Sequence, residues 1–446
     1  MDKTLYKAIL REWEEKNLPK IIDRTISLEE YLNMKINKII VLTGFRRVGK
    51  TYMMLNLAGK KLKNKSREEI VYINFEDERI PLKAEFLTEL IPAIKQTFKM
   101  ETKILFLDEI QTIPNWSKWL RRIHDNEKFI IFVSGSTSKT SSREIPTELR
   151  GRFLEIKVFP LSFKEFLDFK GLKFNLKQIQ YSSNEKAKLI RALEEYLKFG
   201  GFPEIVLTDY TKKQDIAQSY YQTVVRRDII ERYNIKNEGA LKALLLLLLN
   251  STHYSSTKLY NTIKSMNYEV GKSTIQSYIN YIENSYLMFS VPIFSYKIKD
   301  QLQYPRKVYF IDNVFINSIS TKFSGNHGRL YENLMAIDLI KKYEDIYYWK
   351  NQQGEEVDFV IKKGIKVNWL IQVCYDINDG DTKQREIRSL LKAGKELKCK
   401  NLIIITDDYE AEERVKWFNN KTNIKFIPLW KWLLEKHSIN SKSSAL

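Results

Sequence analysis

A glycine-containing loop follows an apolar run near the start of the chain. Residues 44–51 read Gly-Phe-Arg-Arg-Val-Gly-Lys-Thr, and residues 39–42 before them read Ile-Ile-Val-Leu. Glycine lets backbone N–H groups approach phosphate oxygens closely, and the N-terminus of a following helix adds the positive end of its dipole. A strand, this loop and a helix in succession predict an α/β fold with a nucleotide-phosphate site. The alternative is a chance glycine loop.

The residues of this loop have separate expected roles. Lys50 is expected to reach the β- and γ-phosphates, and Thr51 is expected to offer its hydroxyl to Mg²⁺. The other residues expected to contact the nucleotide are Gly44, Arg46, Arg47, Val48, Gly49 and Tyr52. The loop therefore predicts ATP and Mg²⁺ as cofactors.

A second motif is the apolar run Ile104–Leu107, which ends in Asp108 and Glu109. Such a run is typical of a buried strand in a parallel sheet. Asp108 at the strand end is expected to hold Mg²⁺ through water, and Glu109 to polarise the water that attacks the γ-phosphate. The alternative for Glu109 is an ordinary solvated acid.

Two further apolar runs, residues 70–75 and 129–133, have the length of strands and are separated by helical stretches. This alternation predicts a parallel sheet with helices packed against it. Ser134 and Ser136 follow the second run, where one hydroxyl could sense the γ-phosphate or the attacking water. Ser-Gly-Ser could equally be a simple turn, and the sequence does not choose between the two serines.

Arg150 and Arg152 lie between an expected helix and the expected strand at residues 153–158. From there, an arginine could stabilise transition-state charge on the nucleotide of a neighbouring subunit, which requires a homo-oligomer. The alternative is that both are ordinary surface arginines.

Further motifs extend this pattern along the chain. They are Leu-Asp-Glu-Ile-Gln at 107–111, Trp116, Pro-Leu-Ser-Phe-Lys-Glu-Phe at 160–166, Gly-Gly-Phe-Pro-Glu at 200–204 and Arg-Asp-Ile at 227–229. With the loop at 44–51, they make the chain resemble the archaeal and bacterial AAA+ ATPases that carry a C-terminal domain of unknown function. The resemblance covers nearly the whole sequence.

The resemblance implies four parts. They are an AAA+ P-loop ATPase core at 1–165, a helical lid at 166–235, a winged-helix domain at 236–325 and a degenerate PD-(D/E)xK nuclease-like domain at 326–446. The length of 446 residues suits about three domains by the usual size range.

The charge of the chain bears on its partners. Lysine and arginine number 74 against 55 acidic residues, a formal net charge of +19, so DNA is a plausible partner and an acidic membrane surface a second one. The two cysteines have no CxxC spacing and the four histidines are scattered, which indicates neither a disulfide framework nor a zinc cluster. The leucine run 244–249 is too short to span a bilayer, and we expect a cytoplasmic location.

Residues 237–310 have the pattern of a winged helix: three helical stretches followed by two short strand-like runs. In the third stretch Lys272, Thr274, Ser277 and Asn280 are expected to remain on the outside, and Lys297, Lys299, Arg306 and Lys307 are expected on the wing near phosphates. The alternative is a rigid connector between the lid and the C-terminal domain.

The C-terminal segment resembles the PD-(D/E)xK nuclease core, in which carboxylates and one lysine surround Mg²⁺. Glu332 and Asp358 match the first two acids, but Gln372 stands where the third acid belongs and Cys374 where the lysine belongs. Because Gln lacks the charge and Cys lacks the ammonium, we predict an inactive or very weak nuclease fold. Lys362 or Lys363 is a conceivable substitute for the missing lysine.

Two function classes follow from these features. The first is an ATP-hydrolysing protein that acts on or binds DNA. The second is an ATP-dependent signalling or scaffold switch that binds protein partners. An active ATP-coupled nuclease is a third hypothesis, against which Gln372 and Cys374 stand.

Overall fold

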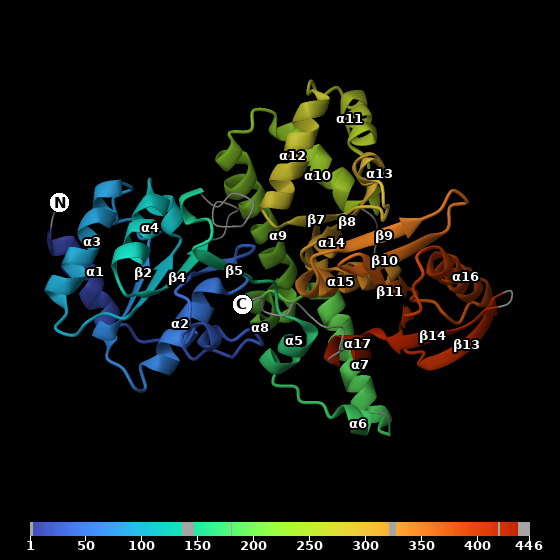
Figure 1. The fold of residues 1–446 in the computed structure, drawn as a ribbon, viewed down its shortest axis with the longest axis horizontal. Coiled ribbons are helices and arrows are strands. Elements are labelled where there is room, and N and C mark those ends of the chain that lie inside the picture. The colour runs from blue at the N-terminus through green and yellow to red at the C-terminus, as the bar shows by residue number, and fades with distance from the viewer. Residues whose placement is uncertain (1–2, 136–146, 180, 321–326, 418–419, 436–446) are drawn as a thin grey trace. The chain divides into compact units, whose positions relative to one another are not determined.

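The structure is a computed structural model that describes residues 3–135, 147–179, 181–320, 327–417 and 420–435. The chain forms two compact units, Met1–Phe159 and Pro160–Leu446. Figure 1 colours the first unit from blue to teal and the second from green to red. The two units are described one at a time below.

The first unit contains a five-stranded sheet in the order β2-β3-β4-β1-β5. Its strands are β1 (Ile39–Thr43), β2 (Ile70–Asn74), β3 (Ile104–Asp108), β4 (Ile130–Gly135) and β5 (Phe153–Lys157). Every neighbouring pair is parallel. The predicted parallel α/β sheet is therefore confirmed, and its order puts β4 between the glycine-loop strand β1 and the acidic strand β3.

Helices cover this sheet, and its strands β1 and β3 are buried along their whole length. The helices of the first unit are α1 (Lys3–Glu15), α2 (Lys50–Lys61), α3 (Ala84–Thr97) and α4 (Trp116–Asn126). Tyr6, Leu87 and Leu120 of α1, α3 and α4 share a core with alternate strand residues such as Val41 and Leu105. The α2 helix lies on the opposite side of the sheet (Figure 1).

The second unit begins with helices and includes a small antiparallel sheet in the order β6-β8-β7. The helices before, between and directly after the strands of this sheet are α5 (Phe163–Phe169), α6 (Leu176–Ile179), α7 (Ser183–Phe199), α8 (Pro203–Leu207), α9 (Lys213–Thr223), the π-helical segment Val224–Glu231, α10 (Glu238–Leu249), α11 (Ser256–Ser265), α12 (Lys272–Asn284), α13 (Ile298–Gln303) and α14 (Asn313–Ile319). The strands are β6 (His253–Tyr254), β7 (Met288–Val291) and β8 (Arg306–Phe310).

A six-stranded mixed sheet in the order β13-β14-β12-β11-β10-β9 follows. Its elements are α15 (His327–Lys342), β9 (Ile346–Lys350), β10 (Glu356–Lys363), β11 (Lys366–Val373), α16 (Gly380–Glu396), β12 (Leu402–Thr406), β13 (Ala411–Trp417), β14 (Asn420–Pro428) and α17 (Leu429–Leu434). Along β12, Ile403 and Ile405 face the core of α15 and α17, whereas Leu402 and Ile404 face the core of α16. A strand buried on both faces reads as a continuous apolar run.

A shared core joins the segments of the second unit. Phe163 of α5, Tyr196 of α7, Tyr309 of β8, Phe359 of β10 and Trp432 of α17 belong to one hydrophobic cluster. The three segments that the resemblance implies as lid, winged helix and nuclease-like domain therefore pack as one compact unit. Within the described residues, no helix is long and apolar enough to cross a bilayer.

Candidate functional site

The loop between β1 and α2 has a backbone that only glycine allows at two positions. Gly44 has φ +139°, and a Cβ atom there would lie 2.1 Å from the carbonyl oxygen of Val158. Gly49, with φ +98°, precedes the first residue of α2. Left-handed backbone at these points turns the loop sharply into the helix N-terminus.

Lys50 is the first residue of α2, and its side chain lies inside the loop. Its exposed fraction is 6%. The ammonium donates to the carbonyl oxygens of Gly44 and Phe45, each at 2.9 Å. The buried ammonium of Lys50 is thus hydrogen-bonded to its own loop, and phosphate oxygens could replace these carbonyl oxygens as its acceptors.

Asp108, the last residue of β3, accepts three side-chain hydrogen bonds. The hydroxyls of Thr51 and Tyr72 each donate to its Oδ2 at 2.7 Å, and Ser134 donates to its Oδ1. Burial raises the pKa of Asp108, and these three hydroxyls act in the opposite direction. The structure thus brings together Thr51 and Asp108, the two residues expected at Mg²⁺, and Ser134 donates a hydrogen bond to the same acid.

Glu109 directly follows β3 in a left-handed conformation, with φ +55°. Its N–H donates to the carbonyl oxygen of Ser134 at 3.2 Å, and Gln111 donates to its carboxylate. The side chain is therefore oriented by a second residue. The sequence predicts no role for Tyr72 or Gln111. Their contacts depend on how β2 pairs with β3 and on how the turn after β3 folds, which only the tertiary structure shows.

Other loop residues are also fixed in place. Arg24 donates to the carbonyl oxygens of Val48 and Phe159, each at 3.0 Å, and thereby ties the loop to the end of the first unit. Arg46 lies 3.5 Å from the carboxylate of Glu76. Tyr52 points outward, 55% exposed. Arg24 carries no motif signal in the sequence, so only the structure reveals it.

The two arginines differ in their surroundings. Arg152 makes a two-bond contact to Asp125, with Nε at 2.9 Å and Nη2 at 3.2 Å. It precedes β5, whose start pairs with the start of β1, so it lies at the sheet edge opposite the loop. Arg150 is exposed, without a partner among the residues that the structure describes. Ser136 lies outside the described residues.

These residues fit the cofactors that the sequence predicts. A hydroxyl and a carboxylate meet at the loop, and both are oxygen ligands of the kind that Mg²⁺ takes. The loop combines a buried ammonium with the first N–H groups of α2, which suits phosphate. Thr51 and Asp108 therefore meet at one edge of the sheet, with Lys50 next to Thr51 in α2 and Glu109 next to Asp108 after β3.

A second charged cluster lies in the Pro160–Leu446 unit and corrects the sequence prediction for Lys307. That lysine was expected on the wing near phosphates, but it is 2% exposed. Its ammonium lies 2.6 Å from Asp358, 2.8 Å from Glu356 and 2.9 Å from Glu332. Burial by itself would lower the pKa of Lys307, but attraction to Asp358 and Glu332 outweighs it and raises the pKa.

The four predicted residues of the nuclease-like site separate into two groups. Glu332 and Asp358 both contact Lys307, and Gln372 accepts a hydrogen bond from the N–H of Asp358 at 3.1 Å. Cys374 instead packs in an apolar cluster with residues such as Val360 and Leu390, and burial raises its pKa to about 12. Its thiol is therefore neutral and no substitute for an ammonium.

The conceivable substitutes for the missing lysine lie elsewhere. Lys362 is 3.9 Å from Asp345 near the outer end of β10, and Lys363 is exposed. Lys307 is the lysine that reaches the acids. Its signal in the sequence was the alternation of Lys307 and Tyr309 along β8, which puts both on the same face.

The residues expected to face DNA are also placed. Lys272 and Asn280 of α12 and Lys297 and Lys299 near α13 are exposed, whereas Thr274, Ser277 and Arg306 are partly buried. The inward side of α12 is Ile275, Ile279 and Ile282, as the sequence predicts.

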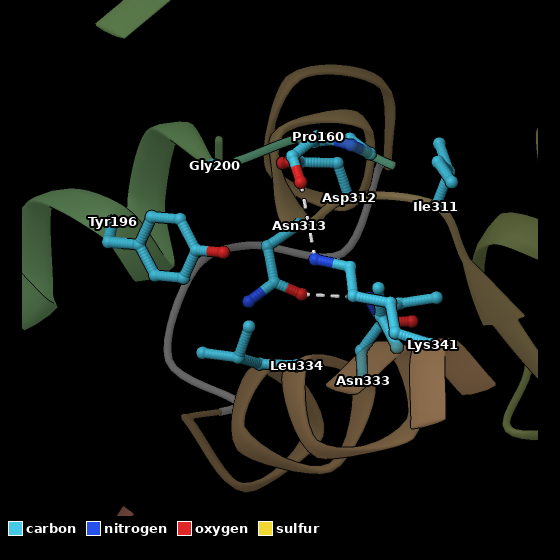
Figure 2. Close-up of a pocket in the computed structure, with 10 residues that line it drawn as sticks. Pro160, Tyr196, Gly200, Ile311, Asp312, Asn313, Asn333, Leu334 and Lys341 are labelled. Atoms are coloured by element: carbon cyan, nitrogen blue, oxygen red, sulfur yellow. Dashed lines mark hydrogen bonds between the residues drawn. The ribbon is translucent and has the colours of Figure 1, made fainter. Parts of the chain in front are cut away.

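A small cavity lies where α7, α14 and α15 meet (Figure 2). Its volume is about 10 Å³, room for a single water molecule. Lys341 donates to the carbonyl oxygen of Pro160 at 3.2 Å, and Asn333 to Asn313 at 2.9 Å. The cavity is a packing feature rather than a ligand site.

The Gly-Gly motif at 200–201 serves this packing. A Cβ atom on Gly200, which has φ +71°, would lie 1.5 Å from Oδ1 of Asp312. The N–H of Gly201 donates to Asp312 at 2.8 Å, and that of Val314 at 2.9 Å. Burial nevertheless raises the pKa of Asp312 to about 6.

Comparison with known families divides the chain into three matches. An AAA domain matches residues 36–167, a domain of unknown function (DUF8612) matches 190–325, and another (DUF4143) matches 327–432. These matches together span most of the chain.

Two proteins are similar over nearly their full lengths. The "Uncharacterized protein MJ1544" of Methanocaldococcus jannaschii is 40% identical over 438 residues, which cover 96% of this chain and 94% of that protein. An "Uncharacterized protein" of Haemophilus influenzae is 27% identical over 421 residues, 92% of this chain and 99% of that protein.

Among solved structures, the Walker-type ATPase of Pyrococcus abyssi is similar with a TM-score of 0.45 at 13% identity, covering 67% of this chain and 95% of that one. The Aeropyrum pernix Orc1 protein in complex with DNA has a TM-score of 0.29 at 13% identity, covering 75% and 94%. Scores this low carry no argument about this chain. The sequence similarity does: the chain belongs to the same family as the Methanocaldococcus jannaschii protein and carries an AAA domain at residues 36–167.

Proposed function

We propose that this protein hydrolyses ATP with Mg²⁺ and couples the nucleotide state to DNA bound by its second unit. The observation that carries the hydrolytic part is the meeting of Thr51 and Asp108 at 2.7 Å beside the loop that holds Lys50. Bound Mg²⁺ would neutralise charge that develops on the β- and γ-phosphate oxygens.

The residues of the chain have distinct tasks in this reaction. Lys50 leaves the carbonyl oxygens of Gly44 and Phe45 and pairs with phosphate oxygens. Thr51 and Asp108 present oxygens to the metal side of the site. Glu109, oriented by Gln111, accepts a proton from the attacking water as a general base.

Charge on the transition state needs a further cation, which we assign to an arginine supplied by a second copy of the chain. The candidates are Arg150 and Arg152. Arg150 is the better candidate, because Arg152 already makes two hydrogen bonds to Asp125. This assignment makes the active form a homo-oligomer.

The DNA part of the proposal rests on residues 237–310. Three helices, α10 to α12, precede or flank the sheet β6-β8-β7, an arrangement that suits a winged helix. Lys272 and Asn280 are exposed on α12, and Lys297 and Lys299 are exposed beyond β7. A helix of this kind can enter the major groove while basic wing residues contact phosphates.

A switch that binds protein partners is the second candidate, and one observation favours it. Tyr296, Ile298, Leu302 and Tyr304 are 53–75% exposed around α13, beside the basic residues. An exposed apolar surface of this kind also suits a protein partner. Nuclease activity is disfavoured because Gln372 accepts from a backbone N–H and Cys374 lies in an apolar core.

The experiment is ATP turnover with and without single-stranded, duplex and four-way-junction DNA. We expect one DNA form to stimulate turnover, and Lys50→Ala and Glu109→Gln to abolish it. Binding to that DNA should weaken steeply as salt rises, because bound lysines release counterions. If no DNA form changes ATP turnover and none binds at low salt, the switch that binds protein partners is favoured.

A matched pair tests the DNA surface. Lys272→Ala and Lys297→Ala should each reduce DNA affinity and the salt slope, whereas basal turnover should not change. Lys363→Ala, at an exposed position on β10, is the control. If all three behave alike, general positive charge rather than the winged-helix segment attracts DNA.

A further inference from the structure

The cluster around Lys307 joins three elements of the second unit. The lysine comes from β8, Glu332 from α15, and Glu356 and Asp358 from β10. Its ammonium lies 2.6–2.9 Å from one oxygen of each of the three carboxylates. An ammonium has three donors, so the three acids match its hydrogen-bonding capacity.

Other polar groups also contact the acids. Tyr309 donates to Glu332 at 2.7 Å, and the N–H of Val373 donates to Asp358 at 2.9 Å. Lys350 and His253 lie 3.1 and 3.3 Å from Glu356. The cluster is therefore built around a cation, and that cation is part of the chain.

The nuclease-like resemblance implies a divalent cation at these acids, and the residues present do not fit one. Mg²⁺ needs about six oxygens at about 2.0–2.1 Å, whereas the point shared by these carboxylates is filled by an ammonium. Gln372, the position of the third acid, gives its carbonyl oxygen to the N–H of Asp358. Among the described residues, no group of His, Cys, Asp and Glu is arranged to hold a metal.

We propose that Lys307 is a built-in replacement for the divalent cation of the nuclease-like fold. It occupies the place where a metal would bind, and it holds β8, the central strand of the small sheet, against α15 and β10. The lysine also stabilises the fold, because removing it would leave the buried Asp358 and the partly buried Glu332 without the ammonium that they share. The ion pairs of Lys307 thus hold the small sheet against α15 and the C-terminal sheet.

The proposal predicts that removing the lysine opens a metal site. Mn²⁺ binding to the full chain without nucleotide is measured by electron paramagnetic resonance, and thermal melting is followed with and without Mn²⁺. Wild-type protein should show no binding that depends on Asp358. Lys307→Met should gain one Mn²⁺ per chain and melt at a higher temperature with Mn²⁺ than without it.

Two further variants assign the gained site. Lys307→Met combined with Asp358→Asn should lose the Mn²⁺ and the melting shift. Lys350→Met removes a lysine that also contacts Glu356 but is 44% exposed, and it should gain no Mn²⁺. ATP turnover is a separate measurement, so failure here is distinguishable from failure of the proposed hydrolysis.

Each outcome decides the proposal. Wild-type protein that binds Mn²⁺ and loses it on Asp358→Asn would show that the lysine does not close the site, and DNA cleavage under the same conditions would make Lys307 a nuclease residue. A folded Lys307→Met that binds no Mn²⁺ also overturns it. If Lys307→Met fails to fold, recovery of the folded protein by Mn²⁺ supports the proposal, and no recovery contradicts it.

Discussion

At the scale of single residues, this protein places its acids in contrasting environments. Asp108 is buried and receives three hydroxyls, whereas the neighbouring Glu109 is only partly buried and is turned by a left-handed backbone. The carboxylate of Asp108 is thus held by hydroxyl groups, whereas that of Glu109 is partly exposed to water. Asp312, buried in the second unit, has neither role and serves packing alone.

Glu109→Gln should lower the turnover of ATP by about 10²–10⁴-fold while nucleotide affinity changes little, because the amide cannot accept the proton of the attacking water. Turnover and binding of a fluorescent nucleotide measure the two effects. Glu78→Gln, an exposed acid beyond β2, is the control. Equal losses in both variants would remove the general-base role from Glu109.

Asp312 should make the stability of the second unit depend on pH. Its pKa of about 6 in the folded protein is above the value of about 4 in an unfolded chain, so the folded state binds the proton more tightly. This stabilisation is complete below about pH 4 and is lost as the pH rises through about 6.

The test compares urea unfolding of wild-type protein and Asp312→Asn between pH 4 and 7. The free energy of unfolding of the variant should gain about 1–3 kcal/mol relative to wild type across this range. Asp215→Asn, on the exposed side of α9, is the reference variant. A constant difference between wild type and Asp312→Asn would contradict the raised pKa.

At the scale of elements, motifs that look alike in the sequence do different work. The glycines at 44 and 49 shape a loop for phosphate, whereas those at 200 and 201 let the end of α7 approach Asp312. Likewise β8 was interpreted as a wing strand, yet its alternate residues Lys307 and Tyr309 face the acids of the C-terminal sheet. The role of an element therefore depends on the residues that it packs against and not on its sequence pattern alone.

Gly200→Ala should destabilise the second unit far more than Gly171→Ala. Both glycines have positive φ, +71° and +69°, but a Cβ atom would strike Asp312 at the first position and meet nothing within 4 Å at the second. We expect a loss of about 3 kcal/mol or more against about 1 kcal/mol. Chemical unfolding of the two variants measures both, and similar losses would mean that the backbone angle alone decides.

At the scale of the whole molecule, two units with separate cores carry different chemistry. The Met1–Phe159 unit holds the loop and Asp108, and the Pro160–Leu446 unit holds the exposed basic residues and the Lys307 cluster. Each unit buries its own hydrophobic clusters. A ligand of one unit should therefore act first on the stability of that unit.

Heating should reveal two unfolding transitions, of which ATP analogue and Mg²⁺ raise only one. A ligand at about 100 times its dissociation constant adds about 2.7 kcal/mol to the unit that binds it. Calorimetry measures the transitions, and Lys50→Ala should remove the shift. A single transition that moves as a whole would show that the two units unfold together.

The sequence by itself determined the parallel α/β core, because a strand, a glycine loop and a helix are local patterns that tolerate few folds. It also predicted that Thr51 and Asp108 belong to one site, and their side chains meet at the carboxyl edge of the sheet. Only the tertiary structure decided the roles of Tyr72, Gln111 and Arg24. These contacts depend on strand register and on turns that join distant segments.

The tertiary structure also decided what Lys307 does. The sequence around Lys307 does not indicate that this lysine is buried. Its three acidic partners lie 25–51 positions further along the chain. Likewise the shared core of the second unit is invisible in any one segment, because it forms only when helices and both sheets pack together. Short-range sequence patterns determine the helices, strands and motifs. Burial and ion pairs between residues far apart in the sequence determine what the side chains of those elements contact.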